Sequence, residues 1–239
     1  MKISITIPFH NEEKNLEILL PKLFKNLLLL KKENFEIILV DDLSTDRSYQ
    51  ICNNFIRKNK KIKCKLLKLK KKGGQTGALK KAFSVARGNF IITMDADLQD
   101  RPKDISKFVK KIRSGYDVVL GFRMKRKSSY ILKFSIIIYD FLLSLFINAK
   151  LKSFRAQYAA FRRSYLIGIP KYKNDHRYLC PIAIHRGASK LTEVLLEHKK
   201  RKYGHSKYQQ LPKIVFGFFE VILFLIRLKL GLYRLNKTR

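Results

Sequence analysis

Hydrophobic residues in the first hundred positions come in short runs, separated by longer stretches in which they recur every three or four positions. The runs lie at residues 3–7, 35–40, 64–69 and 90–94, and their length and apolar character indicate buried strands. The stretches that follow the first three runs have the period of amphipathic helices. Strand and helix therefore alternate. This alternation predicts an α/β fold, with a mostly parallel sheet and helices on both of its faces.

Polar and acidic residues directly follow three of these predicted strands. They occupy residues 10–12 after the first strand, 41–42 after the second and 95–99 after the fourth. In open α/β sheets, the carboxyl ends of the strands form the crevice in which ligands bind. The sequence therefore predicts that three segments far apart along the chain meet at one site.

Two later stretches, 131–147 and 213–234, are heavily apolar but carry a narrow polar stripe at helical spacing. Their uninterrupted apolar spans are shorter than the ~18–20 residues that a transmembrane helix needs. Wide apolar faces flanked by Lys and Arg are typical of helices in a membrane interface, although packing on the core would leave the same pattern. We expect a main domain over residues 1–210 that includes an amphipathic membrane-interface helix at 128–150. A C-terminal amphipathic membrane-associating helix and basic tail are expected at 211–239, a bilayer-spanning helix being the less favoured alternative.

The composition is strongly basic, with 52 Lys and Arg against 18 Asp and Glu in 239 residues and a formal net charge of +34. Since 46% of the residues are hydrophobic, a disordered basic tail protein is excluded. The charge implies an anionic partner, which can be nucleic acid, anionic lipid or a phosphorylated substrate. No RRM, KH, zinc-finger or helix-turn-helix signature is visible, so we expect no nucleic-acid partner.

The three cysteines, Cys52, Cys64 and Cys180, are isolated and form no C-x-x-C pair. This pattern predicts free thiols in a reducing compartment rather than a disulfide framework. The first residues show no secretory signal pattern. We therefore expect the protein on the cytosolic side.

The chemistry is most specific at Asp95 and Asp97, which lie two residues apart at the end of a predicted strand. Two carboxylates and the amide oxygen of Gln99 are hard ligands that suit Mg²⁺ or Mn²⁺. Such a pair alone is more typical of a cap or a solvated turn. Its position after an apolar strand, beside two other polar segments, favours a metal site.

Four segments, at residues 7–16, 39–48, 74–79 and 94–100, resemble the ordered motifs of family 2 glycosyltransferases. Within that family they are most similar to the dolichyl- and polyprenyl-phosphate sugar transferases, since residues 201–208 also match the motif R-x-x-G-x-S-K-Y. The match covers residues 3–210 in the right order. It implies a GT-A type, Rossmann-like fold. It also implies a metal-dependent, inverting transfer of a sugar from a UDP- or GDP-linked donor to polyprenyl phosphate.

The resemblance also assigns roles to individual residues. The expected nucleotide-binding residues are Pro8, His10, Glu12, Asp42, Gln75 and Asp95. The metal and the diphosphate are expected at Asp95, Asp97 and Gln99, and the acceptor phosphate at Arg123, Lys133, Arg201, Ser206 and Lys207. Of these residues, Asp97, Arg123 and Arg201 are the expected catalytic residues. The carboxylate of Asp42 can accept an N–H from uracil or guanine, which would give selectivity for the base.

The chain departs from the family pattern at three places. His10 stands where the family usually has Tyr, and Arg101 replaces a common Pro. The segment at residues 153–163 lacks the Asp commonly found there, which leaves the sugar unassigned.

The acceptor class follows from charge. A lipid monophosphate is largely anionic near neutral pH because its second pKa is ~6, so its oxygen needs positioning more than a general base. A sugar hydroxyl would need a carboxylate base, and no second carboxylate pair follows Asp97. The sequence therefore favours polyprenyl phosphate over the alternative, a growing polysaccharide or lipopolysaccharide. The expected location is the cytoplasmic face of a membrane, with peripheral or monotopic attachment to its anionic surface.

Overall fold

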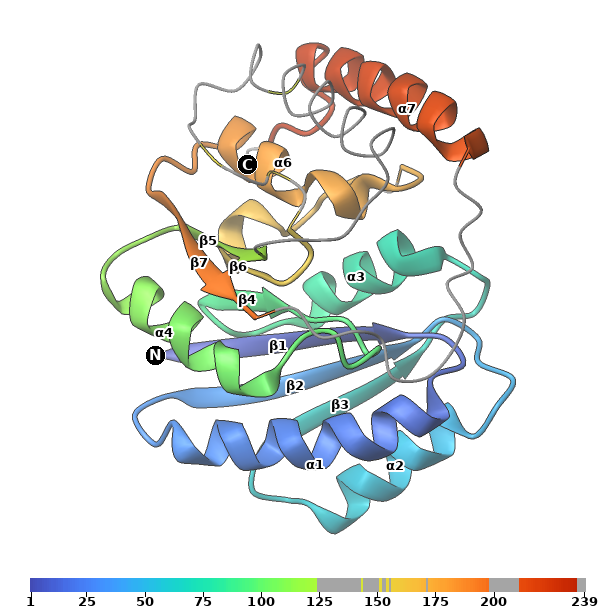
Figure 1. Cartoon of the computed structure of the whole chain (residues 1–239), viewed down its shortest axis with the longest axis vertical. Coiled ribbons are helices and arrows are strands. Elements are labelled where there is room, and N and C mark those ends of the chain that lie inside the picture. Colours follow the sequence, from blue (N-terminus) through green and yellow to red (C-terminus); the bar gives the residue numbers. More distant parts are fainter. Residues whose placement is uncertain are drawn as a thin grey trace.

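Seven strands form one mixed, mostly parallel sheet at the centre of the protein (Figure 1). The computed structural model describes residues 1–123, 143, 151, 154, 156–170, 172–197 and 211–235. The strand order is β3-β2-β1-β4-β6-β5-β7. The strands are β1 (Lys2–Phe9), β2 (Asn34–Asp41), β3 (Lys63–Lys68), β4 (Phe90–Thr93), β5 (Val118–Arg123), β6 (Ala159–Arg162) and β7 (Leu191–Leu196). Only β6 runs antiparallel to its neighbours β4 and β5, so the predicted α/β fold is confirmed.

Helices cover both faces of the sheet, as the alternating pattern predicts. The helices are α1 (Glu13–Leu29), α2 (Ser48–Lys58), α3 (Gly74–Val85), α4 (Ile105–Arg113), α6 (Leu179–His185) and α7 (Leu211–Lys229). Short 3-10 helices are η1 (Pro102–Asp104), η2 (Arg163–Tyr165) and η3 (Asp175–Tyr178). Side chains of α1, α2 and α4 join one hydrophobic core, and those of α3, α6 and α7 join the other (Figure 1).

The strands are apolar throughout because both of their faces are buried. Successive side chains of a strand point to opposite faces, so Ile37 and Leu39 of β2 belong to the core under α1, whereas Ile38 and Val40 belong to the core under α3. Because β1 is parallel to its neighbours β2 and β4, the carboxyl ends of these three strands lie at the same edge of the sheet.

The predicted bounds of the first four strands hold to within two residues, and the starts of the helices have physical reasons. The first helix begins at Glu13, because Asn11 takes a left-handed backbone conformation with φ of 56° that no helix continues. The third helix begins at Gly74, since the carboxylate of Asp42 binds the amides at its start.

The cysteines are free, as predicted. Burial raises the pKa of the Cys52 thiol to about 12 and that of Cys64 to about 11. Both thiols therefore stay protonated at neutral pH and contribute to packing.

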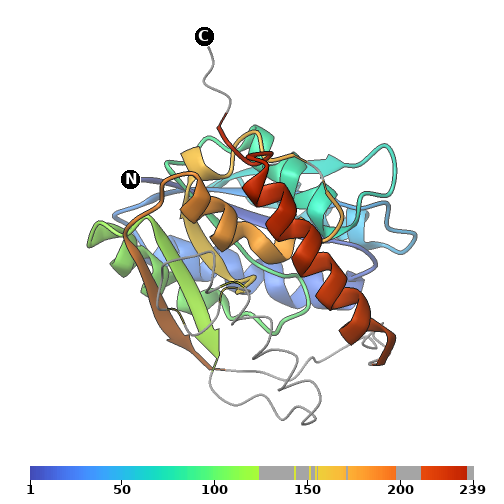
Figure 2. The same ribbon diagram turned by 90° about the horizontal axis from the view of Figure 1, so that it is seen from above.

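The predicted C-terminal helix is present as α7, which lies across the outer surface of α6 (Figure 2). The other predicted amphipathic helix, at 128–150, falls outside the described residues apart from Leu143, which is buried. Within the described ranges, no helix combines the length and the apolar character that crossing a bilayer requires.

The turn before β4 depends on a close approach of Gly88 to β1. The Gly88 N–H donates to the Ser4 Oγ at 2.9 Å, and the Ser4 hydroxyl in turn donates to the buried Glu36 carboxylate at 2.7 Å. A Cβ on Gly88 would lie 2.6 Å from the Ser4 backbone nitrogen and 2.8 Å from the Phe90 carbonyl oxygen, both of which are fixed by the sheet.

We expect Gly88→Ala to lower the free energy of unfolding by about 3 kcal/mol, because the added methyl forces the backbone of two paired strands apart. Urea unfolding followed by circular dichroism measures the change. Gly217→Ala in α7 is the control, since its Cβ would meet nothing within 4 Å and alanine favours a helix over glycine by about 1 kcal/mol. Equal unfolding midpoints for the two variants would contradict the expected clash.

Candidate active site

The loops that follow β1 and β2 are fastened to each other at the carboxyl edge of the sheet. The Asn11 N–H donates to Ser44 Oγ at 3.0 Å, and the Thr45 N–H donates to Asn11 Oδ1 at 2.8 Å. The Glu12 N–H donates to Ser48 Oγ at 2.8 Å, which extends the contact to the start of α2. Residues 10–12 and 41–48 therefore form one continuous wall.

Asp42 connects this wall to α3. Its Oδ1 accepts the Gly73 N–H at 2.6 Å and its Oδ2 accepts the Gly74 N–H at 2.9 Å, and the residue is only 5% exposed. A carboxylate is favoured here because the amides at a helix N-terminus are unpaired and carry the positive end of the helix dipole. The contact fixes where α3 begins relative to β2.

Gln75 continues the connection from α3 to the end of β4. Its Nε2 donates to Asp95 Oδ1 at 2.8 Å. Asp42, the first turn of α3 and Asp95 thus lie in one chain of hydrogen bonds, although they are more than 50 residues apart in sequence. The structure therefore brings together three of the residues that the sequence assigns to the nucleotide.

The D-x-D segment turns back on itself directly after β4. The Asp95 N–H donates to Asp100 Oδ2 at 3.1 Å, and the Gln99 N–H donates to Asp97 Oδ1 at 3.1 Å. Asp97 is half-buried, and no Lys or Arg of the described residues forms an ion pair with it. Its second oxygen is thus available to a cation.

The donor set suits a divalent cation that completes its shell with substrate. Within the described ranges, no three His, Cys, Asp or Glu side chains cluster in a way that would enclose a metal ion. Mg²⁺ and Mn²⁺ are commonly held by one or two carboxylates and take their remaining ligands from water and phosphate. The residues present at 95–99 therefore fit such an ion.

Each of the three strand ends carries one residue in the left-handed region. These residues are Asn11, Leu43 and Leu98, with φ of 56°, 61° and 65°. For leucine such a conformation is strained, and strained backbone that persists is concentrated at functional sites. At Leu43 the strain is held by Asp41, whose Oδ1 accepts both the backbone N–H and the hydroxyl of Ser44. The Asp-Asp-Leu-Ser run, which the sequence places at a strand end and in a family motif, forms this turn.

The other predicted nucleotide residues line the same edge. Pro8, the penultimate residue of β1, is half-buried. The His10 Nε2 lies 3.3 Å from Lys72 Nζ, and the Glu12 carboxylate accepts a hydrogen bond from the Asn15 side-chain amide at 2.5 Å. Their roles toward a nucleotide stay predictions. Among the expected acceptor residues, Arg123 is the last residue of β5, and its side chain is not described. Lys133, Arg201, Ser206 and Lys207 lie outside the described residues.

Arg101, which departs from the family pattern, connects the D-x-D loop to the residue that follows the edge strand β7. It is nearly buried, and its guanidinium pairs with Glu197, which follows β7, and with Asp104 at 3.7 Å. Its backbone oxygen accepts the Tyr158 hydroxyl at 3.0 Å. The substitution therefore replaces a stiff proline by an ion pair that holds the same loop.

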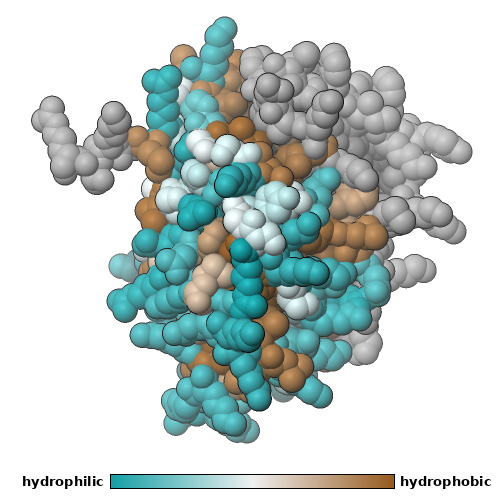
Figure 3. Space-filling view, turned by 90° about the vertical axis from the view of Figure 1, so that its left-hand side faces the viewer, coloured by the Kyte–Doolittle hydropathy of each residue, from teal (hydrophilic) through white to brown (hydrophobic). Residues whose placement is uncertain are grey.

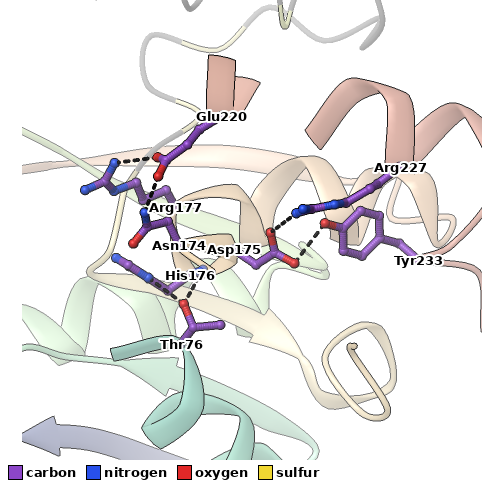
Figure 4. Close-up of polar contacts among 8 residues, drawn as sticks. All are labelled: Thr76, Asn174, Asp175, His176, Arg177, Glu220, Arg227 and Tyr233. Carbon is purple, nitrogen blue, oxygen red and sulfur yellow. Dashed lines mark hydrogen bonds and ion pairs between the residues drawn. The ribbon is translucent and has the colours of Figure 1, made fainter. Parts of the chain in front are cut away.

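A contact that the sequence pattern did not predict joins α3 to η3. The hydroxyl of Thr76, next to Gln75, lies 2.8 Å from His176 Nδ1 (Figure 4). Residues 175–178 form η3, packed between α3 and α7.

The burial of His176 makes the stability of the fold depend on pH. The imidazole is 8% exposed, and burial together with the nearby Arg177 lowers its pKa from 6.5 to about 3. Below pH 6.5 the His176 imidazole is protonated in the unfolded chain but stays neutral in the folded chain. The free energy of unfolding therefore decreases as the pH falls from 6.5 toward 3. Burial raises the pKa of Asp175 from 3.8 to about 6, which adds stability as the pH falls through that range and offsets part of the loss.

We expect His176→Gln to flatten this dependence. Between pH 7 and pH 5, wild type should lose about 2 kcal/mol of unfolding free energy that the variant keeps, at about 1.4 kcal/mol per pH unit below 6.5. Urea unfolding of both proteins at the two pH values measures the difference. An identical change with pH in the two proteins would show that His176 is protonated in the folded state.

Residues 4–169 match the family model described as Glycosyl transferase family 2. Two relatives, both named undecaprenyl-phosphate 4-deoxy-4-formamido-L-arabinose transferase, come from Photorhabdus laumondii and Proteus mirabilis. The first is 31% identical over 207 residues, covering 87% of this chain and 63% of the relative. The second is 32% identical over 215 residues, covering 89% and 64%. The chain thus spans slightly less than two thirds of the length of these relatives.

Solved structures of similar fold include glucosyl-3-phosphoglycerate synthase from Mycobacterium tuberculosis, with a TM-score of 0.68 at 16% identity over 95% of this chain and 79% of that chain. TarS from S. aureus, solved with UDP-GlcNAc, has a TM-score of 0.61 at 24% identity over 94% of this chain and 65% of that chain. These likenesses confirm the predicted GT-A type fold. Since the family model covers well over half of the residues, the chain belongs to glycosyl transferase family 2.

Proposed function

We propose that the chain is an inverting glycosyltransferase that moves a sugar from a UDP- or GDP-linked donor to polyprenyl phosphate. The observation that carries this proposal is the chain of contacts from Asp42 through Gly74 and Gln75 to Asp95, with Asp97 open beside it. It places carboxylates at the carboxyl end of the sheet, where a nucleotide diphosphate and its cation would bind. The names of the two relatives support an undecaprenyl-phosphate acceptor.

Asp95, Asp97 and Gln99 would hold Mg²⁺ or Mn²⁺. When bound, such an ion neutralises the diphosphate leaving group as the glycosidic bond breaks. The protein's own contribution is geometric. Gln75 holds Asp95 through its amide, and Asp42 holds α3 and therefore Gln75. Solved neighbours that contain Mn²⁺ with UDP or with GDP-mannose support this cation class and both nucleotide classes.

The acceptor phosphate would be positioned by basic side chains. Arg123 and Arg201 are the proposed catalytic residues on the acceptor side, with Lys133, Ser206 and Lys207 binding the same phosphate. A phosphate monoester is already anionic near neutral pH, so charge-assisted hydrogen bonds that aim its oxygen at the anomeric carbon suffice. Direct displacement from the face opposite the nucleotide inverts that carbon.

A panel assay tests this function. UDP- and GDP-linked sugars are offered with Mn²⁺ and either short-chain polyprenyl phosphate or an oligosaccharide acceptor. We expect an inverted glycosyl phosphate lipid from at least one donor, with polyprenyl phosphate as sufficient acceptor. Transfer to the oligosaccharide alone would support the alternative function in polysaccharide or lipopolysaccharide synthesis and overturn the lipid-phosphate acceptor.

We also propose that α7 lies on an anionic membrane surface. Val221, Phe224 and Leu228 of this helix are buried against the core, while a second apolar stripe is exposed. The exposed large side chains are Phe219, Ile222, Leu223, Ile226 and Leu230. The face seen in space-filling view is largely hydrophilic with scattered hydrophobic atoms, and most of α7 lies on the far side of this view (Figure 3). Exposed Lys229 and Arg234 flank the stripe, as is typical of helices in an interface.

We expect the double variant Ile226→Ser/Leu230→Ser to bind vesicles of anionic phospholipid at least ~10-fold more weakly than wild type, because burial of each side chain in lipid contributes about 1.5 kcal/mol or more. Vesicle flotation measures the bound fraction. Leu28→Ser/Leu29→Ser is a matched control, since Leu29 and Leu230 are both 69% exposed but Leu29 lies in α1, on the other side of the sheet. Equal loss of binding in both variants would show that α7 is not the membrane-facing element.

A further inference from the structure

Residues 174–178 lie between the first turn of α3 and helix α7 (Figure 4). On the α3 side, the His176 Nδ1 lies 2.8 Å from the Thr76 Oγ1, and the His176 backbone N–H donates to the same oxygen at 3.5 Å. Thr76 directly follows Gln75, whose side chain holds Asp95. Any displacement of η3 is therefore passed to the turn that carries the contacts of the candidate nucleotide site.

On the other side, α7 and the residues that follow it bind η3 through the buried carboxylate of Asp175. The Tyr233 hydroxyl donates to Asp175 Oδ2 at 2.8 Å, and the Arg227 guanidinium lies 3.8 Å from Asp175 Oδ1. Asp175 is 1% exposed and Tyr233 is fully buried. Removing one partner of a buried carboxylate leaves an uncompensated charge, so this contact strongly favours a single arrangement.

A second set of contacts lies about two helical turns before Arg227 along α7. The Glu220 carboxylate accepts hydrogen bonds from the Asn174 side-chain amide and, at 3.2 Å, from Arg177 (Figure 4). Tyr178 stacks on Phe224 of α7, with ring centroids 4.1 Å apart and planes 6° from parallel. Asn174 itself has a φ of 64°, a conformation that the surrounding contacts must hold.

Three different kinds of contact thus bind η3 to α7, and one polar pair binds it to α3. The segment has a polar or aromatic partner on α7 at Asn174, Asp175, Arg177 and Tyr178, and His176 contacts Thr76 of α3. Among the described residues, α7 thus supplies several of the side-chain contacts that position this segment. The Thr76–His176 pair is the point at which that position reaches the Gly74–Gln75 turn.

We propose that residues 174–178 are a positioning element through which α7 holds the first turn of α3 in the geometry that binds the nucleotide. Thr76, His176, Asp175 and Tyr233 are then positioning residues, which act through Gln75 and the Gly73 and Gly74 amides without touching substrate. This inference rests on the proposed function, because it assigns an effect on nucleotide affinity. It also means that a contact made by α7, including contact with a lipid surface, is linked to the nucleotide site.

A double-mutant cycle tests the proposal. Thr76→Val removes the hydroxyl that faces His176 at nearly constant volume, and Tyr233→Phe removes the hydroxyl that faces Asp175. Isothermal titration calorimetry of UDP and of GDP with Mn²⁺ gives the dissociation constants of wild type, both single variants and the double variant. We expect each single variant to weaken binding about three- to tenfold, and the double variant to weaken it by clearly less than the product of the two factors.

Two further variants separate positioning from a general loss of structure. Thr76→Ser restores the hydroxyl and should restore wild-type affinity. Tyr165→Phe removes a hydroxyl that donates to the Gly187 carbonyl at 3.4 Å, outside the segment, and should leave affinity unchanged. If Tyr233→Phe does not fold, Glu220→Gln replaces it in the cycle, because Glu220 is half-exposed and its amide variant still accepts from one partner.

The outcomes distinguish this proposal from the function on which it rests. If wild type binds the nucleotides but the single variants bind equally well, or if their effects simply multiply, the positioning role is overturned and the proposed function stands. If wild type binds neither nucleotide with Mn²⁺, the proposed function is overturned and the positioning role with it.

Discussion

Replacing Asp97 by asparagine is expected to lower the rate of sugar transfer about 1,000-fold, since a lost charged metal ligand costs about 4 kcal/mol of transition-state stabilisation. The asparagine keeps the Oδ1 that accepts the Gln99 N–H, so the loop after β4 retains its described contact. The fold should therefore be as stable as that of wild type. Initial rates under saturating donor and acceptor, with thermal unfolding midpoints alongside, measure both quantities.

Chelation and a contrasting variant sharpen this prediction. EDTA should abolish transfer by wild type, and added Mn²⁺ should restore it, whereas Mn²⁺ should not restore the variant. Asp117→Asn is the contrasting control, because Asp117 lies at the opposite end of the sheet and pairs with Arg162 at 2.9 Å. It should lose stability but keep activity per folded molecule. Full activity of Asp97→Asn, or of wild type in EDTA, would remove Asp97 from the metal site.

Replacing Asp42 by asparagine is expected to weaken nucleotide binding about 100-fold, which corresponds to about 2.7 kcal/mol. Both of its oxygens accept amide hydrogens at the start of α3, and an asparagine NH₂ would face one of those donors. The buried N–H left without an acceptor costs about 1–3 kcal/mol and displaces the turn that carries Gln75. The effect should therefore appear in both nucleotide affinity and folding stability.

The neighbouring Asp41 provides a matched control for this variant. Asp41 is buried like Asp42. Among the described residues, however, its side-chain carboxylate accepts hydrogen bonds from Ser44 alone, through Oδ1. Asp41→Asn keeps an oxygen for that contact and should change the dissociation constant of the nucleotide by much less. Calorimetric titration of both variants with the nucleotide measures the two dissociation constants. A larger loss of affinity for Asp41→Asn than for Asp42→Asn would show that the tether to α3 is not what supports binding.

The first half of the fold could be predicted because it is made of local signals. Buried strands and amphipathic helices each leave their own period in the sequence, so β1 to β4 and α1 to α3 were found with small boundary shifts. The strands β5, β6 and β7 were not predicted. They are four to six residues long, and β6 pairs antiparallel between strands that come earlier in the chain, an arrangement that no local period reveals.

The site shows the same division. That polar residues end three strands is visible in the sequence, and their meeting follows from the parallel pairing of β1 with β2 and β4. What could not be predicted is how they are held. The contact of Asp42 with Gly73 spans 31 residues and that of Asp175 with Tyr233 spans 58, so only the folded chain shows them. The polar stripe at 213–234 is visible in the sequence, but the partners in η3 of its Glu220 and Arg227 are not.

The most direct test of the proposed site is the titration of wild type with UDP and with GDP, in Mn²⁺ and in EDTA, with Asp97→Asn as the parallel sample. If the ends of β1, β2 and β4 form one cation-dependent nucleotide site, at least one nucleotide should bind in Mn²⁺, and binding should weaken at least ~100-fold on chelation and in the variant. Nucleotide binding of equal strength in Mn²⁺, in EDTA and in Asp97→Asn would contradict it.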